Sequence, residues 1–261
     1  IDPYGLMKLM LGFNSRKLQT LELRGVGVTK YENLAKFWST ACNSVFCSNL
    51  QILVLANLPL FSDTFIRVMC HSENFRNLKN LEIDNCSGIG GKSLYMLGKT
   101  TIITNLEAVT FKRVGDIARD LKALKFFTSK NFGKVRTLSI KEHLFPFDKM
   151  LKLISRYHKS SQITKLSLSK GVLTDKALRI LRSAKNFMGL EELKLSFTEN
   201  KVSQEEFEDF ALEFDFSKIK VLKLSNLQKV SSNGFELLFS ANLKSLNRLS
   251  IQKCTHFNNH S

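Results

Sequence analysis

An aliphatic pattern, LxxLxLxx followed by a small or apolar residue, recurs nine times along the 261 residues. The steps between successive copies are 32, 28, 28, 29, 28, 27, 29 and 27 residues, a spread too narrow to arise by chance. A chain with such a period is a stack of similar supersecondary units, so this repeat limits the fold more than any other feature. The copies begin at Leu18, Leu50, Leu78, Leu106, Val135, Ile163, Leu190, Ile219 and Leu246.

Each copy predicts one strand and one helix. The fourth and sixth positions lie two residues apart, so they point to the same side of a short strand. In segment 171–190, leucines then recur at helical spacing behind Thr174 and Asp175. A hydroxyl there can accept from free N–H groups at the helix start, and an acid suits the helix dipole. Ser62 and Ser231 precede similar patterns, so each copy is expected to be strand, turn, helix, turn.

One copy cannot bury its aliphatic side chains, whereas stacked copies form a continuous apolar ladder between a strand layer and a helix layer. Helices are wider than strands, so the stack is expected to curve. The predicted fold is an α/β solenoid shaped like a horseshoe, with parallel strands on the concave face and helices on the convex face. We expect a single domain of about nine repeats over residues 1–261.

Both ends of the chain match internal parts of a repeat. Residues 1–6 align with the helix start at 173–178, and residues 254–259 align with the turn and helix start of a tenth copy. Neither end has the polar composition of a solenoid cap. We therefore expect a fragment of a longer repeat protein, with residues 1–3 as a cloning remnant being the alternative.

The repeats resemble those of a known class. Their 27 to 29 residues and the pattern C-x-x-[apolar]-[ST]-[DN]-x-[GA]-L resemble the cysteine-containing leucine-rich repeats of F-box proteins. They are also similar to the repeats of ribonuclease-inhibitor-like proteins and of Ran GTPase activators. Cys86 and Cys254 hold the ninth position, where other copies have Val, Leu, His, Gly or Thr. The resemblance implies protein recognition, as the substrate receptor of a ubiquitin ligase in an F-box protein or as a GTPase-activating protein in the Ran-activator class.

Charge and composition indicate the kind of partner. The formal charge of +16 favours acidic proteins or nucleic acid, although a lysine-rich composition by itself would also produce it.

The sequence also indicates where the protein is found. No run of about eighteen apolar residues could span a membrane, and the first residues lack a signal-peptide pattern. The five cysteines are widely spaced in apolar surroundings, which indicates reduced thiols. We therefore expect a cytoplasmic or nuclear protein that does not bind a membrane.

The sequence contains no motif that predicts catalysis, so we expect a binding protein and not an enzyme. None of the five histidines lies at a spacing that places two metal ligands on one helix face, so no metal is expected. Residues 88–91, Gly-Ile-Gly-Gly, are better explained by a turn and a helix start than by phosphate binding. No cofactor or small-molecule substrate is predicted.

The predicted concave face offers a contact surface. It carries the third, fifth and seventh positions of each copy, which from the fourth copy onward are mostly hydroxyls and cations, with Glu192 the only acid. An acidic protein segment suits these columns, and an apolar patch in the second copy could supply a desolvated centre. Nucleic acid is the alternative, although the columns lack aromatic residues for base stacking. The predicted partner-binding residues are Ile52, Val54, Lys112, Lys141, Lys165, Lys194, Lys223 and Arg248.

Overall fold

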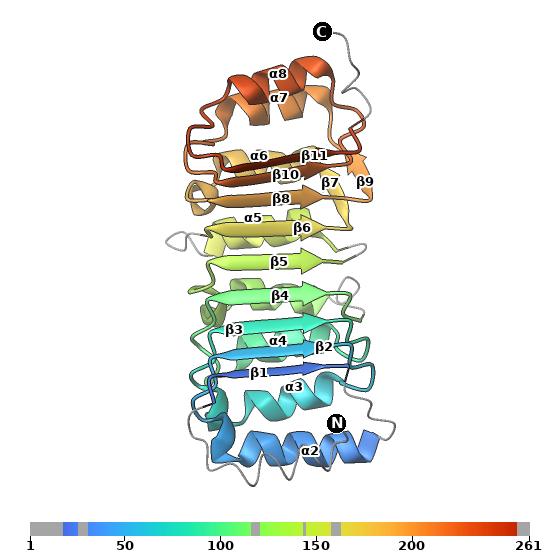
Figure 1. The fold of residues 1–261 in the computed structure, drawn as a ribbon, viewed down its shortest axis with the longest axis vertical. Coiled ribbons are helices and arrows are strands. Elements are labelled where there is room, and N and C mark those ends of the chain that lie inside the picture. Colours follow the sequence, from blue (N-terminus) through green and yellow to red (C-terminus); the bar gives the residue numbers. More distant parts are fainter. Residues whose placement is uncertain (1–17, 26–30, 116–120, 143–144, 158–162, 255–261) are drawn as a thin grey trace. The chain divides into compact units, whose positions relative to one another are not determined.

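The computed structural model describes residues 18–25, 31–115, 121–142, 145–157 and 163–254. The chain divides into two compact units, residues 1–135 and 136–261. Each unit is an α/β structure with a parallel sheet (Figure 1). Parts of the predicted repeats, namely Val26, His143 and both terminal segments, lie outside the described residues.

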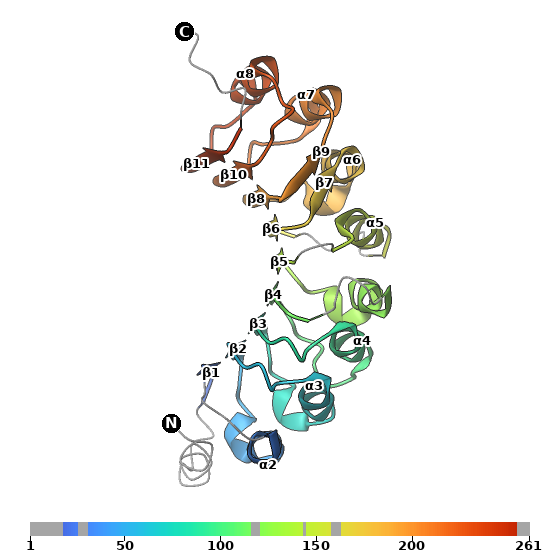
Figure 2. The same cartoon turned by 90° about the vertical axis from the view of Figure 1, so that its right-hand side faces the viewer.

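In the first unit, helices lie on one side of a four-stranded parallel sheet (Figure 2). Its strands are β1 (Thr20–Arg24), β2 (Ile52–Ala56), β3 (Asn80–Asp84) and β4 (Ala108–Lys112). Its α-helices are α2 (Tyr31–Asn43), α3 (Asp63–Cys70) and α4 (Gly91–Lys99). Its 3-10 helices are η1 (Val45–Cys47), η2 (Glu73–Phe75), η3 (Leu121–Thr128) and η4 (Lys130–Phe132).

The second unit repeats this arrangement with a five-stranded parallel sheet, again covered by helices on one side (Figure 2). Its strands are β5 (Thr137–Lys141), β6 (Lys165–Ser169), β8 (Glu192–Ser196), β10 (Val221–Ser225) and β11 (Arg248–Gln252). Its helices are α5 (Phe147–Tyr157), α6 (Asp175–Ser183), η5 (Lys185–Phe187), α7 (Gln204–Glu213) and α8 (Ser232–Ser240). A separate parallel pair, β7 (Val172–Thr174) and β9 (Glu199–Lys201), was not predicted.

All nine predicted strands are confirmed, and each begins at the third position of its copy. Within each unit the register aligns the fourth and sixth positions of neighbouring copies, as in Leu53 beside Leu81 and Leu55 beside Ile83. These side chains face the helices and are buried, except in the outermost described strands, where Leu21, Leu249 and Ile251 are partly exposed. Each buried leucine contributes about 1.5–3 kcal/mol relative to exposure, so the repeated pattern stabilises the sheet directly.

The turn after each strand has a recurring backbone conformation. The eighth position has a positive φ, between 50° and 70°, in seven of the nine copies. Only Gly25 among them is a glycine; Asn57, Asn85 and Asn226 suit this region, whereas Arg113, Lys170 and Lys253 are ordinary side chains in a strained one. Local preference therefore favours the turn in four copies, whereas at Arg113, Lys170 and Lys253 the same conformation occurs without such a preference.

Aspartates at helix starts join successive repeats. The Asp63 carboxylate accepts from the backbone N–H of Gly90 at 2.8 Å and of Ser93 at 3.2 Å, at the start of the next helix. Asp175 likewise accepts from the N–H of Ser203 at 2.6 Å. The Gly-Ile-Gly-Gly segment thus leads into a helix start, and the Gly90 N–H in it already donates to a carboxylate.

Two expectations for the helices need correction. The fourth copy has η3 in place of an α-helix, because its buried residues recur every third position, as in Leu124 and Phe127, which suits three residues per turn. Ser62 and Ser231 occupy cap positions, but neither side chain accepts a capping hydrogen bond. At Ser62 the backbone carbonyl takes the N–H of Phe65 instead. Thr174 caps as predicted, accepting from Ala177.

Candidate partner-binding face

The side of each sheet opposite the helices, here called the open face, is formed by the first, third and fifth residues of each strand. In the second unit the parallel register places these residues in rows that cross the strands. One row runs Thr137, Lys165, Glu192, Val221 and Arg248. The middle row runs Ser139, Ser167, Lys194, Lys223 and Ser250. The third row runs Lys141, Ser169, Ser196, Ser225 and Gln252.

On the open face of the first unit, each acid is paired with a cation. Glu22 accepts from Arg24 at 3.0 Å, and Asp84 accepts from Arg113 at 2.8 Å. The predicted site residue Lys112 lies 3.1 Å from Glu82, so its charge is already neutralised. Its predicted role as a partner-binding residue stays a prediction, and a ligand carboxylate at Lys112 would have to compete with Glu82.

The apolar patch predicted in β2 is smaller than expected. Val54 is only 5% exposed and Ala56 only 2%, while Ile52 is half-buried. Val54 lies beside Glu22 and Glu82 in the register, so both of its neighbours across the strands have longer side chains. The expectation that Val54 and Ala56 face solvent is therefore wrong.

The open face of the second unit carries five cations against one acid, Glu192. Three of these cations, Lys141, Lys223 and Arg248, form no ion pair with any described residue. Lys223 lies beside Lys194 in the register, on strands about 4.8 Å apart. Lys194 is paired with Glu192, whereas Lys223 has no carboxylate partner among the described residues.

The remaining two cations share Glu192. The Lys165 Nζ lies 2.9 Å from Glu192 Oε1, and the Lys194 Nζ lies 2.8 Å from Glu192 Oε2. Hydrogen bonds from Lys194 and then from Lys165 lower the pKa of Glu192, so this carboxylate stays ionised at neutral pH. The three side chains line a hollow of about 170 Å³ together with the hydroxyl side chains Thr137, Ser139 and Ser167.

A larger hollow of about 790 Å³ lies at the strand starts of the first unit and is rich in side-chain amides. The amides recur once per repeat, and they connect neighbouring repeats. Asn77 donates to the Ser48 carbonyl at 2.9 Å, and Asn105 donates to the Arg76 carbonyl at 3.0 Å. The amides therefore have a structural role, since they join neighbouring repeats. In the sequence they can be recognised by the 28-residue spacing of Asn49, Asn77 and Asn105.

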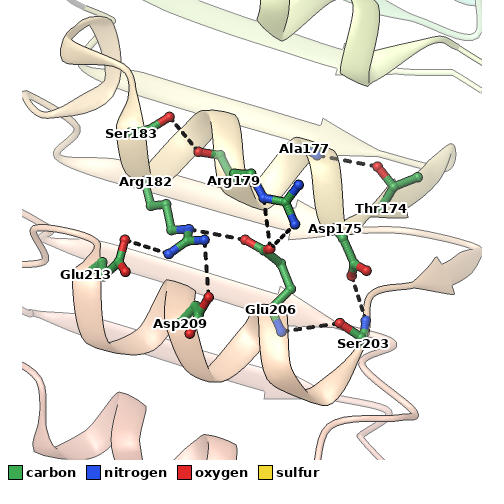
Figure 3. Close-up of polar contacts among 10 residues, drawn as sticks. All are labelled: Thr174, Asp175, Ala177, Arg179, Arg182, Ser183, Ser203, Glu206, Asp209 and Glu213. Atoms are coloured by element: carbon green, nitrogen blue, oxygen red, sulfur yellow. Dashed lines mark hydrogen bonds and ion pairs between the residues drawn. The ribbon is translucent and has the colours of Figure 1, made fainter.

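A second concentration of charge joins α6 to α7 on the helix side of the second unit (Figure 3). Glu206 accepts a hydrogen bond from Arg179 at 2.7 Å, and its other oxygen forms an ion pair, without a hydrogen bond, with Arg182 at 3.1 Å; the Glu206 side chain is only 5% exposed. Arg182, 11% exposed, also reaches Asp209 at 3.2 Å and pairs with Glu213. Because both arginines of α6 already have carboxylate partners on α7, the cluster joins two repeats. Sequence analysis did not identify it.

The cysteines are packed as expected. All five are free, and Cys42, Cys47, Cys70 and Cys86 are buried, whereas Cys254 is partly exposed. Burial raises the pKa of the Cys47 and Cys70 thiols to about 12 and that of Cys86 to about 11, and it also raises the pKa of Cys42. Because the thiolate is the nucleophile, these four thiols are poorly reactive at neutral pH.

Thiol titration with an aromatic disulfide reagent at pH 8 is expected to modify no more than one cysteine in the folded protein and all five after denaturation. The single reactive thiol is Cys254, so a Cys254→Ser variant should show no rapid reaction before unfolding. Rapid modification of two or more thiols in the folded variant would contradict the burial described above.

Comparison with known proteins adds no relatives: no family model matches the chain, and no curated protein matches it in sequence. Within the described ranges, no group of three histidine, cysteine or acidic side chains is arranged to hold a metal ion. None of the helices in that part of the chain combines the length and apolar character needed to cross a bilayer.

Proposed function

We propose that the chain is a leucine-rich repeat solenoid of horseshoe shape whose strand face binds an acidic segment of a protein partner. The observation that carries this proposal is the excess of cations on the open face of the second unit. Three of them, Lys141, Lys223 and Arg248, have no carboxylate partner among the described residues. An incoming carboxylate would meet these charges without first breaking an ion pair.

The neighbouring groups suit a protein ligand. Serine hydroxyls occupy much of the third row, and hydroxyls both donate to and accept from a peptide backbone. The cations would steer the partner and set its register, which makes association faster at low ionic strength. By contrast, this face has no aromatic side chain on which a nucleic-acid base could stack. An acidic polypeptide is therefore favoured over nucleic acid.

A labelled poly-glutamate peptide tests the proposal. We expect the protein to bind it at low salt, and to bind poly-glutamine far more weakly. The triple variant Lys141→Glu, Lys223→Glu and Arg248→Glu should weaken poly-glutamate binding at least about tenfold, because each reversal turns an attraction into a repulsion. Fluorescence anisotropy over a salt series measures both the affinity and its salt dependence.

The matched control makes the same change in charge on the helix side of the same unit. Lys149, Lys152 and Lys176 are exposed there and have no ion pair among the described residues, so their reversal to glutamate should change the affinity by less than about threefold. Equal weakening in both triple variants would show a general charge effect and no defined site. Tighter binding of single-stranded DNA with the same number of charges would favour the nucleic-acid alternative.

A further inference from the structure

The acid on the open face occupies an unusual position. Glu192 is the first residue of β8, and the register places it directly beside Lys165, the first residue of β6. Lys194 lies two residues further along the same strand and so points to the same side. Both ammonium groups contact the carboxylate, one on each oxygen, at 2.9 Å and 2.8 Å.

This geometry is that of a bound carboxylate. Two ammonium groups hold the two oxygens, and hydroxyl side chains from Thr137, Ser139 and Ser167 line the rest of the hollow of about 170 Å³. A carboxylate from a partner would meet the same donors if Glu192 were absent. With Glu192 present, such a group must displace it or remain near an ionised acid of the same charge.

We infer that Glu192 is a specificity-determining residue of the open face, acting as an internal competitor that keeps carboxylate ligands away from Lys165 and Lys194. This inference rests on the proposed function, since it concerns ligands of the same face. By occupying Lys165 and Lys194, Glu192 limits strong binding of ligand carboxylates to β10, β11 and Lys141. Segments whose acids lie over β6 and β8 are rejected, while a hydroxyl or amide group is accepted there.

Glu192 remains ionised, and so remains a competitor for the two lysines, at physiological pH. The two lysines lower the pKa of Glu192, and its hydrogen bond raises the pKa of Lys165, so Glu192 and Lys165 stay charged at neutral pH. Protonation of Glu192 cannot release the lysines under conditions in which a carboxylate ligand is itself ionised. Displacement therefore requires a ligand with more acidic groups, or a change in the protein.

Glu192→Gln tests the inference with the same poly-glutamate peptide. The amide keeps the shape but loses the charge, so the variant should bind the peptide about tenfold more tightly than the wild type and with a steeper salt dependence. Adding Lys194→Gln to Glu192→Gln should return the affinity close to the wild-type value. Glu199→Gln is the matched control, because Glu199 is an exposed acid near Lys201 on β9, away from this hollow, and its loss should change the affinity less than threefold.

The outcomes separate the inference from the proposed function. Equal affinities of Glu192→Gln and Glu199→Gln, or weaker binding by Glu192→Gln, would overturn the role of Glu192 while wild-type binding still supported the proposed function. Binding by Glu192→Gln but not by the wild type would support the competitor and overturn acidic segments as the natural ligand. Absence of binding by every folded variant would overturn both.

Discussion

Phe65→Ala is expected to destabilise the first unit by about 3–5 kcal/mol, the usual cost of removing a buried phenyl ring. Phe65 is 2% exposed, and its ring stacks on Phe61 with 4.5 Å between centroids. Its carbonyl accepts from the indole N–H of Trp38 at 2.9 Å, and Trp38 packs edge-on against Phe61. Trp38 is the only tryptophan in the chain, so its fluorescence reports the unfolding of this unit. The urea midpoint should fall by about 1–3 M.

Leu121→Ala provides the control for this measurement, because it also removes an apolar side chain from the first unit. Leu121 is 61% exposed, so its truncation should change the free energy of unfolding by no more than about 0.5 kcal/mol. A shift of the same size for both variants would mean that the Trp38 environment does not depend on the packing around Phe65.

Glu206→Ala is expected to destabilise the contact between α6 and α7 by about 3 kcal/mol. The change leaves the nearly buried Arg182 with only the more exposed Asp209 and Glu213 as partners, and an under-compensated buried charge is costly. Native-state hydrogen exchange over residues 175–213 measures the loss, since it reports local opening. The amides of both helices should exchange about a hundredfold faster than in the wild type.

Two further variants show whether the faster exchange of Glu206→Ala comes from the loss of this particular ion pair. Glu236→Ala removes an exposed acid of α8 that has no ion pair among the described residues, and it should leave exchange within about threefold of the wild type. The double variant Arg182→Met and Glu206→Met should recover most of the lost stability, because an apolar pair often replaces a buried ion pair without loss. If the double variant is less stable than Glu206→Ala, packing and not the unpaired charge limits this site.

The strands and the core could be predicted from the sequence because they depend on a local pattern repeated nine times. Alternation within LxxLxLxx places two aliphatic side chains per copy on one side of a strand, and the constant period aligns the copies, as in Leu53 beside Leu81. The prediction was weaker where a copy departs from the helical period. In the fourth copy the described residues Leu121–Thr128 form the 3-10 helix η3 where an α-helix was expected.

The binding face could be predicted only in part. The columns on the open side of the sheets were identified correctly and their role in binding stays a prediction, while the state of each charge depends on its neighbours in the fold. Lys112 meets Glu82 across strands, and Lys165 and Lys194 converge on Glu192. These partners lie up to 30 residues apart in the chain, and the side-chain rotamers that join them are not specified by either residue alone.

The sequence by itself determined the period, the positions of the nine repeat strands and the identity of the side chains on each face, because all of these follow from residue spacing; the short pair β7 and β9 was not predicted. Only the tertiary structure decided which cations remain unpaired, how Asp63 and Asp175 cap the following repeats, and how Arg182 and Glu206 join two helices. The physical reason is that burial patterns depend on the average hydrophobicity of a position, whereas ion pairs and caps depend on distances between particular atoms.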